Sequence, residues 1–238
     1  MHRFARVQPT TYVRRALRSP AALVASVAFV LCQAVPASAA TTVGLWHMDE
    51  TSGTTAVDSS GQNNNGSLIN VTFVSPGFNG TGGAYSFNGT SSQVRVPSSA
   101  SLNPGTQAID VTLHVKFTHL PGSVGDYDLV RKTGSGTFYK VEIGPKGQAV
   151  CLFKGTAGKG KVVFGPALNN GSWHTITCTR TGPSGQEVVT AIVDGQSLAK
   201  SVIVGSISGP NPLILSGQKT GTQDLYNGVM DEVSVAIG

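Results

Sequence analysis

The last strand-like stretch of the chain carries an acidic residue where an apolar residue is expected. The stretch reads YNGVMDEVSVAIG, and a period of two puts Asp231 on one face with Val229, Val233, Val235 and Ile237. A buried carboxylate is costly unless it is paired, hydrogen-bonded or bound to a metal ion. Asp231 is therefore predicted either to accept hydrogen bonds from backbone amides and anchor a turn, or to ligate a cation.

Paired carboxylates are the chemistry of glycoside hydrolysis, at about 5 Å for retention or farther apart for inversion. In the last strand the segment MDEVSV brings two acids together, and strict alternation sends Asp231 and Glu232 to opposite faces of the strand. In FYKVEIG, Glu142 and Lys140 share a face that we expect to be exposed, where a surface ion pair is the simpler interpretation. The sequence therefore predicts no catalytic residue.

The histidines are scattered along the chain. Leaving out His2 near the amino terminus, they are His47, His114, His119 and His174, and none has a cysteine or acidic partner at metal-ligand spacing. No nucleophile-elbow signature accompanies them. His174 follows Trp173 on a predicted strand, and the pair is expected to be structural.

The elements that must position these residues are short strands. Almost every segment after the first 39 residues is bounded by Gly, Asn, Pro or Ser, and none has helical periodicity. The clearest strand is IDVTLHVKF, which puts apolar residues on one face: Ile109, Val111, Leu113, Val115 and Phe117. Such strands, at this spacing and with these turn signals, predict an all-β sandwich or barrel with one solvated side.

The first 39 residues are predicted to be an export signal. A basic leader precedes the apolar run AALVASVAFVLCQAV, and ASA at 37–39 is a small-residue cleavage site. The pair Arg14 and Arg15 fits a twin-arginine signal, and a long Sec signal explains it equally well. Five of the 17 Lys and Arg residues and none of the 12 Asp and Glu residues lie in this segment, so the remainder carries 12 of each sign. Nothing in that balance favours nucleic acid or membrane insertion.

Residues 40–238 are expected to form one domain. Two cysteines remain in this part of the chain, Cys151 and Cys178, and neither has the spacing of a zinc or redox site. In an exported chain, two such cysteines predict a disulfide.

Five stretches in order resemble a known family. They are GLWHMDETSGTTAVDSSGQNNNGSL, AYSFNGTSSQVRVPSSASLN, GSWHTITCTR, IVDG and YNGVMDEVSV, and together they span essentially all of residues 40–238. They are similar to the laminin-G-like, concanavalin A-like jelly roll of secreted bacterial proteins. The resemblance implies two facing antiparallel sheets with the first and last strands adjacent. One departure is His114, which stands where relatives often carry an aromatic residue.

Calcium follows from this resemblance. With the first and last strands adjacent, the loop that carries Asp58 approaches Asp231, so the two carboxylates are predicted to share a calcium ion with other oxygen ligands. The loop DSSGQN lacks EF-hand spacing. Hydrogen bonding of Asp231 to amides remains the alternative, and Asp49, Glu50 and Glu232 are weaker candidate ligands.

Sugar binding by this fold generally uses loop side chains and exposed aromatic rings. The segment DYD, Asp126, Tyr127 and Asp128, follows a glycine and is a candidate ligand site, although a solvated turn has the same pattern. The other aromatics considered, Phe138, Tyr139 and Tyr226, are expected to be core residues.

The sequence therefore predicts a secreted, non-catalytic binding or adhesion module. Its expected partner is a glycan or a cell-surface protein, with calcium as a structural ion. Two alternatives stay open: a divergent glycan-active hydrolase or lyase on the same fold, and a purely structural or protein-interaction role.

Overall fold

The computed structural model describes residues 40–122, 125–218 and 223–238. The predicted export signal, residues 1–39, lies outside them. Within these residues the regular secondary structure is β-strand apart from two short 3₁₀ turns, η1 (Phe78–Gly80) and η2 (Ala100–Leu102). No helix in these three ranges is long and apolar enough to cross a membrane.

Sixteen strands make up the described part of the fold. In chain order they are β1 (Thr41–Trp46), β2 (Thr55–Ala56), β3 (Gly66–Ile69), β4 (Thr72–Val74), β5 (Ala84–Asn88), β6 (Gln93–Val96), β7 (Ile109–Lys116), β8 (Tyr127–Thr133), β9 (Phe138–Ile143), β10 (Ala149–Lys154), β11 (Lys159–Phe164), β12 (His174–Thr181), β13 (Glu187–Val193), β14 (Gln196–Val202), β15 (Leu213–Leu215) and β16 (Asn227–Ile237).

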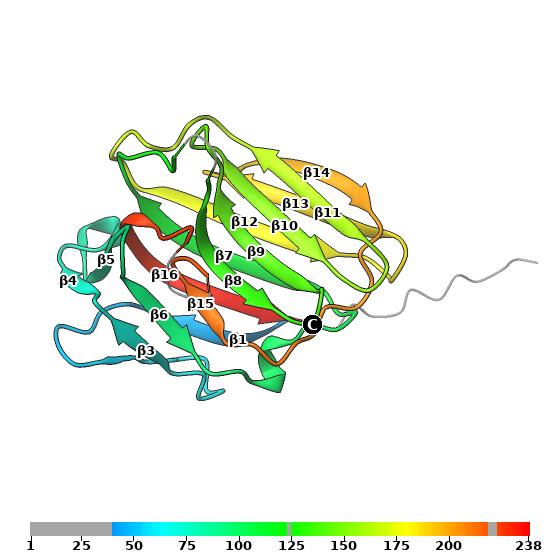
Figure 1. The fold of residues 1–238 in the computed structure, drawn as a ribbon, viewed down its shortest axis with the longest axis horizontal. Coiled ribbons are helices and arrows are strands. Elements are labelled where there is room, and N and C mark those ends of the chain that lie inside the picture. Colours follow the sequence, from blue (N-terminus) through cyan, green and yellow to red (C-terminus); the bar gives the residue numbers. More distant parts are fainter. Residues whose placement is uncertain (1–39, 123–124, 219–222) are drawn as a thin grey trace, which may run out of the picture. The chain divides into compact units, whose positions relative to one another are not determined.

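The strands form two antiparallel sheets that face each other (Figure 1). Sheet 1 has the order β14-β13-β12-β7-β16-β5-β4, with β1 also paired to β16, and sheet 2 has the order β11-β10-β9-β8-β15-β6-β3-β2. The first and last strands are neighbours, with Thr41 opposite Ile237. The predicted two-sheet β-sandwich is confirmed.

The core lies between the two sheets and follows the predicted alternation. In β7, Ile109, Val111, Leu113 and Val115 are at most 2% exposed, whereas the residues between them are partly exposed. β12 and β13 alternate in the same way. The two sheets enclose large aromatic side chains between them: Trp46, Tyr85, Phe87, Tyr139, Phe153 and Tyr226. Because the alternate residues of sheet 1 point away from this core, any polar site on that sheet is built on its outer face.

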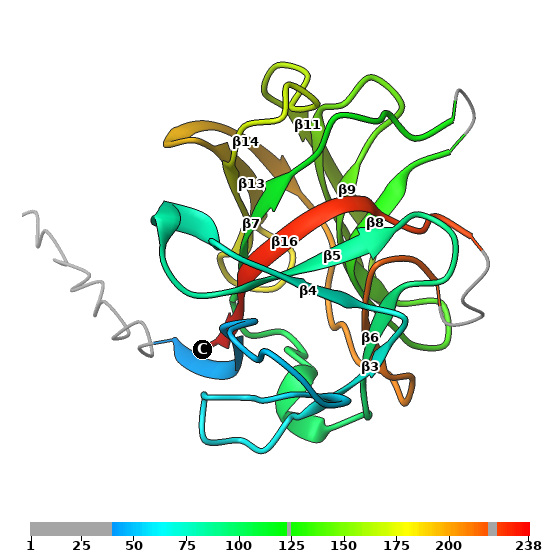
Figure 2. The same cartoon turned by 90° about the vertical axis from the view of Figure 1, so that its left-hand side faces the viewer.

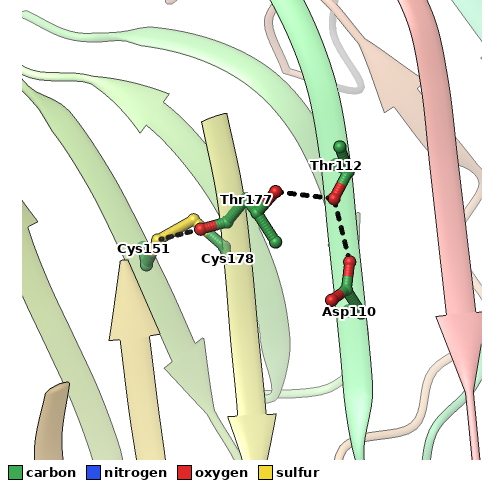
Figure 3. The surroundings of a disulfide bond; sticks show 5 residues. All are labelled: Asp110, Thr112, Cys151, Thr177 and Cys178. Carbon is green, nitrogen blue, oxygen red and sulfur yellow. Dashed lines mark hydrogen bonds between the residues drawn. A yellow bond between two sulfur atoms is a disulfide. The ribbon is translucent and has the colours of Figure 1, made fainter. Parts of the chain in front are cut away.

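A disulfide joins the sheets, as predicted. Cys151 of β10 in sheet 2 is bonded to Cys178 of β12 in sheet 1, with 5.3 Å between the two Cα atoms. Thr177 points to the other side of its strand, where its hydroxyl meets that of Thr112 in β7 at 2.7 Å (Figure 3). The contact of 3.9 Å between Cys151 Sγ and the Thr177 carbonyl oxygen is not a hydrogen bond, because a disulfide sulfur carries no hydrogen. The disulfide therefore clamps the sandwich from inside the core.

Replacing Cys151 and Cys178 together by alanine should lower the free energy of unfolding by about 3 kcal/mol. The crosslink closes a loop with a sequence separation of 27, and opening it restores that loop's entropy to the unfolded chain. Denaturant unfolding would measure the loss. A reductant should destabilise the parent protein and leave the double variant unchanged. Equal stability of the oxidised parent and the double variant would contradict the prediction.

Candidate functional site

The site begins with one extra residue in β16. Between Asp231 and Ser234 the strand advances three residues while its partner β7 advances two, from His114 to Thr112. Glu232 has a φ of 48° at this bulge, in the left-handed region that L residues seldom adopt. Met230 and Val233, three positions apart, are both fully buried in the core. The bulge therefore shifts the alternation of the strand by one residue.

This shift in the alternation explains how a carboxylate is accommodated in the strand. Asp231 leaves the core face and pairs with His114, whose neighbours Leu113 and Val115 point into the core. It also corrects the prediction that Asp231 and Glu232 point to opposite faces, because both line one cavity. Strict alternation fails here because a β-bulge inserts a residue that the alternation rule does not count.

Asp231 accepts two backbone hydrogen bonds. Its Oδ2 accepts from the amide of Phe78 at 2.7 Å and its Oδ1 from the amide of Glu232 at 2.9 Å. The side chain is buried, with 3% of its residue surface exposed. Burial raises the pKa of Asp231 to about 6, the two amides act against that rise, and the nearby carboxylates Glu232 and Asp49 add to it. The predicted amide-anchored arrangement is therefore present.

Three ring side chains pack together beside Asp231: Phe78, His114 and Trp173. Phe78 in η1 stacks on His114 with ring centroids 3.6 Å apart and planes 12° apart, and Trp173 meets it edge-on at 5.9 Å. The amide of Phe78 is also the donor to Asp231, so the same residue is held through both backbone and ring. Burial lowers the pKa of His114, which keeps its imidazole neutral at neutral pH. The Phe78 ring is thus fixed in place by its neighbours.

These groups surround a cavity of about 410 Å³ on the outer face of sheet 1, which we call the β16 cleft. Its lining residues are Leu45, Asp49, Phe78, Asn79, Thr81, Gly82, Thr112, His114, Asp231, Glu232 and Ser234. The β16 residues that line it, Asp231, Glu232 and Ser234, lie where β16 has β7 on one side and β1 on the other. Figure 2 shows β16 beside β7. Its volume falls within the roughly 300–1,000 Å³ that is usual for ligand sites.

Two further carboxylates, Asp49 and Glu232, line the cleft, and each has one oxygen that is available to a ligand. Asp49 Oδ1 accepts from the Gly83 amide at 2.7 Å, and Glu232 Oε2 lies 2.8 Å from His47 Nδ1. Within the described residues, Asp49 Oδ2 and Glu232 Oε1 accept no hydrogen bond. One oxygen of each carboxylate is therefore fixed and the other is available to a ligand.

Asp58 lies elsewhere and is already occupied by hydrogen bonds. Its two oxygens accept from the amides of Leu45, Ser60 and Asn64 and from the Ser60 hydroxyl, at 2.8–2.9 Å. Burial acts to raise its pKa, but these hydrogen bonds together lower it below the usual value. Asp58 does not line the β16 cleft. A calcium ion shared by Asp58 and Asp231 therefore stays a prediction.

A second group of acids lies on sheet 2. Asp126, Asp128 and Glu142, here called the acidic cluster, each offer a carboxylate oxygen within 4.8 Å of the others. Lys140 forms ion pairs with Asp128, at 3.1 Å, and with Glu142. Asp126 Oδ1 and Asp128 Oδ1 are buried without a hydrogen bond, so Asp128 Oδ1 has only its ion-pair contact with Lys140.

The Lys140–Glu142 pair forms as predicted, but its predicted exposed position is wrong. The two side chains are 11% and 3% exposed. β9 is an inner strand of sheet 2, and the neighbouring residues on β8 and β10, Asp128 and Val150, lie directly opposite Glu142 and are themselves buried. Burial raises the pKa of Glu142 to about 7, and the Lys140 charge acts against that rise.

The remaining candidates from the sequence lie mostly in the core. Tyr127 begins β8, is 7% exposed, and meets Phe117 and Tyr226 edge-on. The segment that was expected to be a loop is thus strand from Tyr127 onward, and ligand binding by Asp126, Tyr127 and Asp128 stays a prediction. Tyr139 and Tyr226 are fully buried. His174 is held by Asp194 at 2.7 Å and by Asn170 at 3.0 Å, which fits its expected structural role.

Sequence reasoning missed Phe78 and gave too little weight to Asp49. Phe78 is an isolated aromatic residue among glycines, in the segment PGFNGTGG. The lone ring is a weak signal in the sequence, because single apolar residues on a protein surface are common.

Two facing antiparallel sheets with paired first and last strands define a jelly-roll β-sandwich. The chain belongs to the concanavalin A-like lectin/glucanase superfamily, because the laminin G family of that description matches residues 88–236, which is more than half of the sequence. Among curated proteins, none matches the chain.

Solved structures share the fold at low sequence identity. The binding domain of Paraclostridial Mosquitocidal Protein 1 is 17% identical with a TM-score of 0.64, over 82% of this chain and 48% of that one. Domains LG4-5 of the mouse laminin alpha1 chain are 16% identical (TM-score 0.51; 65% and 43% covered). Domain 4 of AbnA, a GH43 extracellular arabinanase from Geobacillus stearothermophilus in complex with arabinotriose, is 14% identical (TM-score 0.58; 84% and 93% covered). The chain thus spans about half of the toxin domain and nearly all of the arabinanase domain.

The raised pKa of Asp231 predicts a pH-dependent stability difference between the parent protein and Asp231→Asn. A carboxyl whose pKa is higher in the folded state stabilises the fold below its unfolded pKa of about 4 and loses that contribution as the pH rises through about 6. The variant should therefore gain up to about 3 kcal/mol relative to the parent between pH ~4 and pH ~7.5.

Denaturant unfolding of both proteins across this range would measure the difference. His114, whose pKa is lowered, changes stability in the opposite direction with pH, but it is present in both proteins and its contribution is removed by subtraction. A difference that does not change with pH would contradict the raised pKa of Asp231.

Proposed function

We propose that this protein is a secreted carbohydrate-binding module and that the β16 cleft is its ligand site. The observation that carries the proposal is the fixed aromatic ring of Phe78 beside carboxylates with free oxygens. A pyranose ring has apolar C–H faces and hydroxyl edges, so it requires an apolar platform and hydrogen-bond acceptors at right angles to each other.

The cleft offers both kinds of contact. Phe78 supplies the platform, and because His114 and Trp173 already hold the ring, little freedom is lost when a ligand packs on it. Asp49 Oδ2 and Glu232 Oε1 can accept hydrogen bonds from sugar hydroxyls. The backbone between Phe78 and Gly82 closes one side of the cavity.

The comparisons support this class of ligand without identifying it. The superfamily is described by its lectins and glucanases, and domain 4 of the arabinanase was solved with arabinotriose. At identities below 20% these structures share only the fold with the chain. A cell-surface protein is therefore the competing partner.

Export is part of the proposal. Residues 1–39 have the basic leader, apolar run and small-residue site of a signal peptide, and laminin G-like domains are typically extracellular. The disulfide between Cys151 and Cys178 fits an oxidising compartment.

One observation favours a second candidate function, glycoside hydrolysis. Asp231 and Glu232 line the same cleft, and the pKa of Asp231 is raised to about 6. A glycosidase needs one carboxyl that is protonated near working pH and a second that is ionised. Asp231 would be the acid, and Glu232 or Asp49 the base or nucleophile.

Calcium is proposed for the acidic cluster. Three clustered carboxylates, two of which have a buried oxygen without a hydrogen bond, fit the all-oxygen ligands of this ion. A bound calcium would neutralise carboxylates that Lys140 now neutralises only in part, so Lys140 has to give up its contacts with them. The pair Asp58 and Asp231 remains the alternative calcium site.

Replacing Phe78 by alanine should weaken glycan binding about tenfold or more, because the platform is lost. Phe138→Ala is the matched control, since Phe138 is half-buried on β9 in the other sheet. A glycan array followed by titration of the best ligand would measure both variants, with circular dichroism to verify folding. Equal losses in the two variants would contradict the β16 cleft as the site, and reducing ends released from the ligand would favour the hydrolase.

Saturating calcium should raise the unfolding temperature by a few degrees, because an ion that binds only the native state stabilises it. Asp128→Asn should abolish the rise, whereas Asp58→Asn and Asp231→Asn should retain it. Differential scanning calorimetry with calcium and with chelator would measure the effect. A rise that is lost in Asp58→Asn and Asp231→Asn instead would move the ion to that pair, and no rise in the parent would rule out a stabilising calcium.

A further inference from the structure

The charge of the β16 cleft has one sign. Asp49, Asp231 and Glu232 line it, and its lining includes no Lys or Arg. The one imidazole in the lining, His114, is kept neutral by burial at neutral pH. Two basic residues lie near the cleft and are not among the lining residues: Lys116, two residues farther along the same face of β7, and His47, whose Nδ1 lies 2.8 Å from Glu232 Oε2. The surroundings of a bound ligand are therefore anionic.

An anionic cleft with partly apolar walls concentrates its field inside the cavity. Such a field attracts cationic groups and repels anionic ones, and like charges brought together at an interface cost several kcal/mol. Glycans with carboxylate or sulfate groups are therefore disfavoured in this cleft.

Hydrogen bonding leads to the same conclusion. An ionised carboxylate only accepts hydrogen bonds, and an ammonium group only donates them, with three donors on one atom. Hydrogen bonds between charged partners are about twice as strong as those between neutral ones. The free oxygens of Asp49 and Glu232 are thus better matched to an amine than to a hydroxyl. The Phe78 face adds attraction for a nearby cation.

We infer that the β16 cleft binds glycans that carry free amino groups and discriminates against glycans that carry acidic groups. The inference rests on the proposed function, because it names the class of glycan for the same site. In this arrangement the Phe78 ring packs against the sugar ring, and the carboxylates Asp49 and Glu232 bind its amine.

A lysine side chain of a protein partner offers the same ammonium group. A glycan is favoured because the fixed Phe78 ring can pack on the C–H face of a rigid sugar ring, whereas a lysine must immobilise four methylene groups to place its charge. A lysine-rich peptide is therefore included as a competing ligand in the test.

The test compares three oligosaccharides of equal length by isothermal titration near neutral pH and low salt. They are a glucosamine oligomer with free amines, its N-acetylated counterpart and a galacturonic acid oligomer. The amine-bearing oligomer is expected to bind about tenfold more tightly than the acetylated one, and the acidic oligomer is expected not to bind. Added salt should reduce this preference, since it screens the carboxylates.

Glu232→Gln should remove most of the preference for the amine while keeping the binding of the acetylated oligomer. Asp224→Asn is the matched control, because it removes one carboxylate that does not line the β16 cleft and instead lines a separate cavity together with Gly125 and Tyr127. This control should behave as the parent protein does.

The outcomes separate the inference from the proposed function. Equal or tighter binding of the acetylated or acidic oligomer would overturn the amine preference and leave a carbohydrate-binding module. No binding of any of these oligomers, together with a negative glycan array, would overturn both. Binding of a lysine oligomer as tight as that of the glucosamine oligomer would overturn the inference in favour of a protein ligand.

Discussion

The extra residue in β16 is the constraint on which the cleft depends. β16 pairs with β7, β5 and β1, so its register fixes the middle of sheet 1. Without the bulge, the alternation that buries Val233, Val235 and Ile237 would also put Asp231 into the core. An unpaired carboxylate there would cost several kcal/mol. The bulge removes this conflict at the cost of the unusual backbone of Glu232.

The same bulge assembles the site from distant parts of the chain. Asp231 turned outward captures the amide of Phe78, 153 positions earlier in the sequence, and so holds the η1 turn over the sheet. His114 pairs with Asp231 across the sheet, and its ring stacks on that of Phe78. The raised pKa of Asp231 is then a by-product of packing, because the ring and loop that shape the cleft also exclude water from the carboxylate.

The sequence predicted those features that depend on regular patterns. The strands follow from alternation and the disulfide from the cysteine number, whereas the two-sheet sandwich and the pairing of first and last strands follow from the family resemblance of the ordered motifs. The bulge could not be predicted, because Glu232 occupies the left-handed position that glycine or asparagine would have signalled. Nor could the burial of Lys140 and Glu142, because alternation indicates which face a residue is on and not whether neighbouring strands cover that face.

The pairing of β8 with β9 has a consequence for folding fidelity. Asp128 lies directly opposite Glu142 and Arg131 opposite Lys140, so like charges face each other across the two strands. The ion pairs Arg131–Asp128 and Lys140–Glu142 each lie within one strand, and the ion pair that joins the two strands is the diagonal contact between Lys140 and Asp128. A β8–β9 pairing shifted by one residue would turn these charged side chains toward the core. A shift of two residues would separate Lys140 from Asp128. The cluster thus adds little net stability and instead penalises misregistered hairpins, which favours the native pairing while the sheet is still forming.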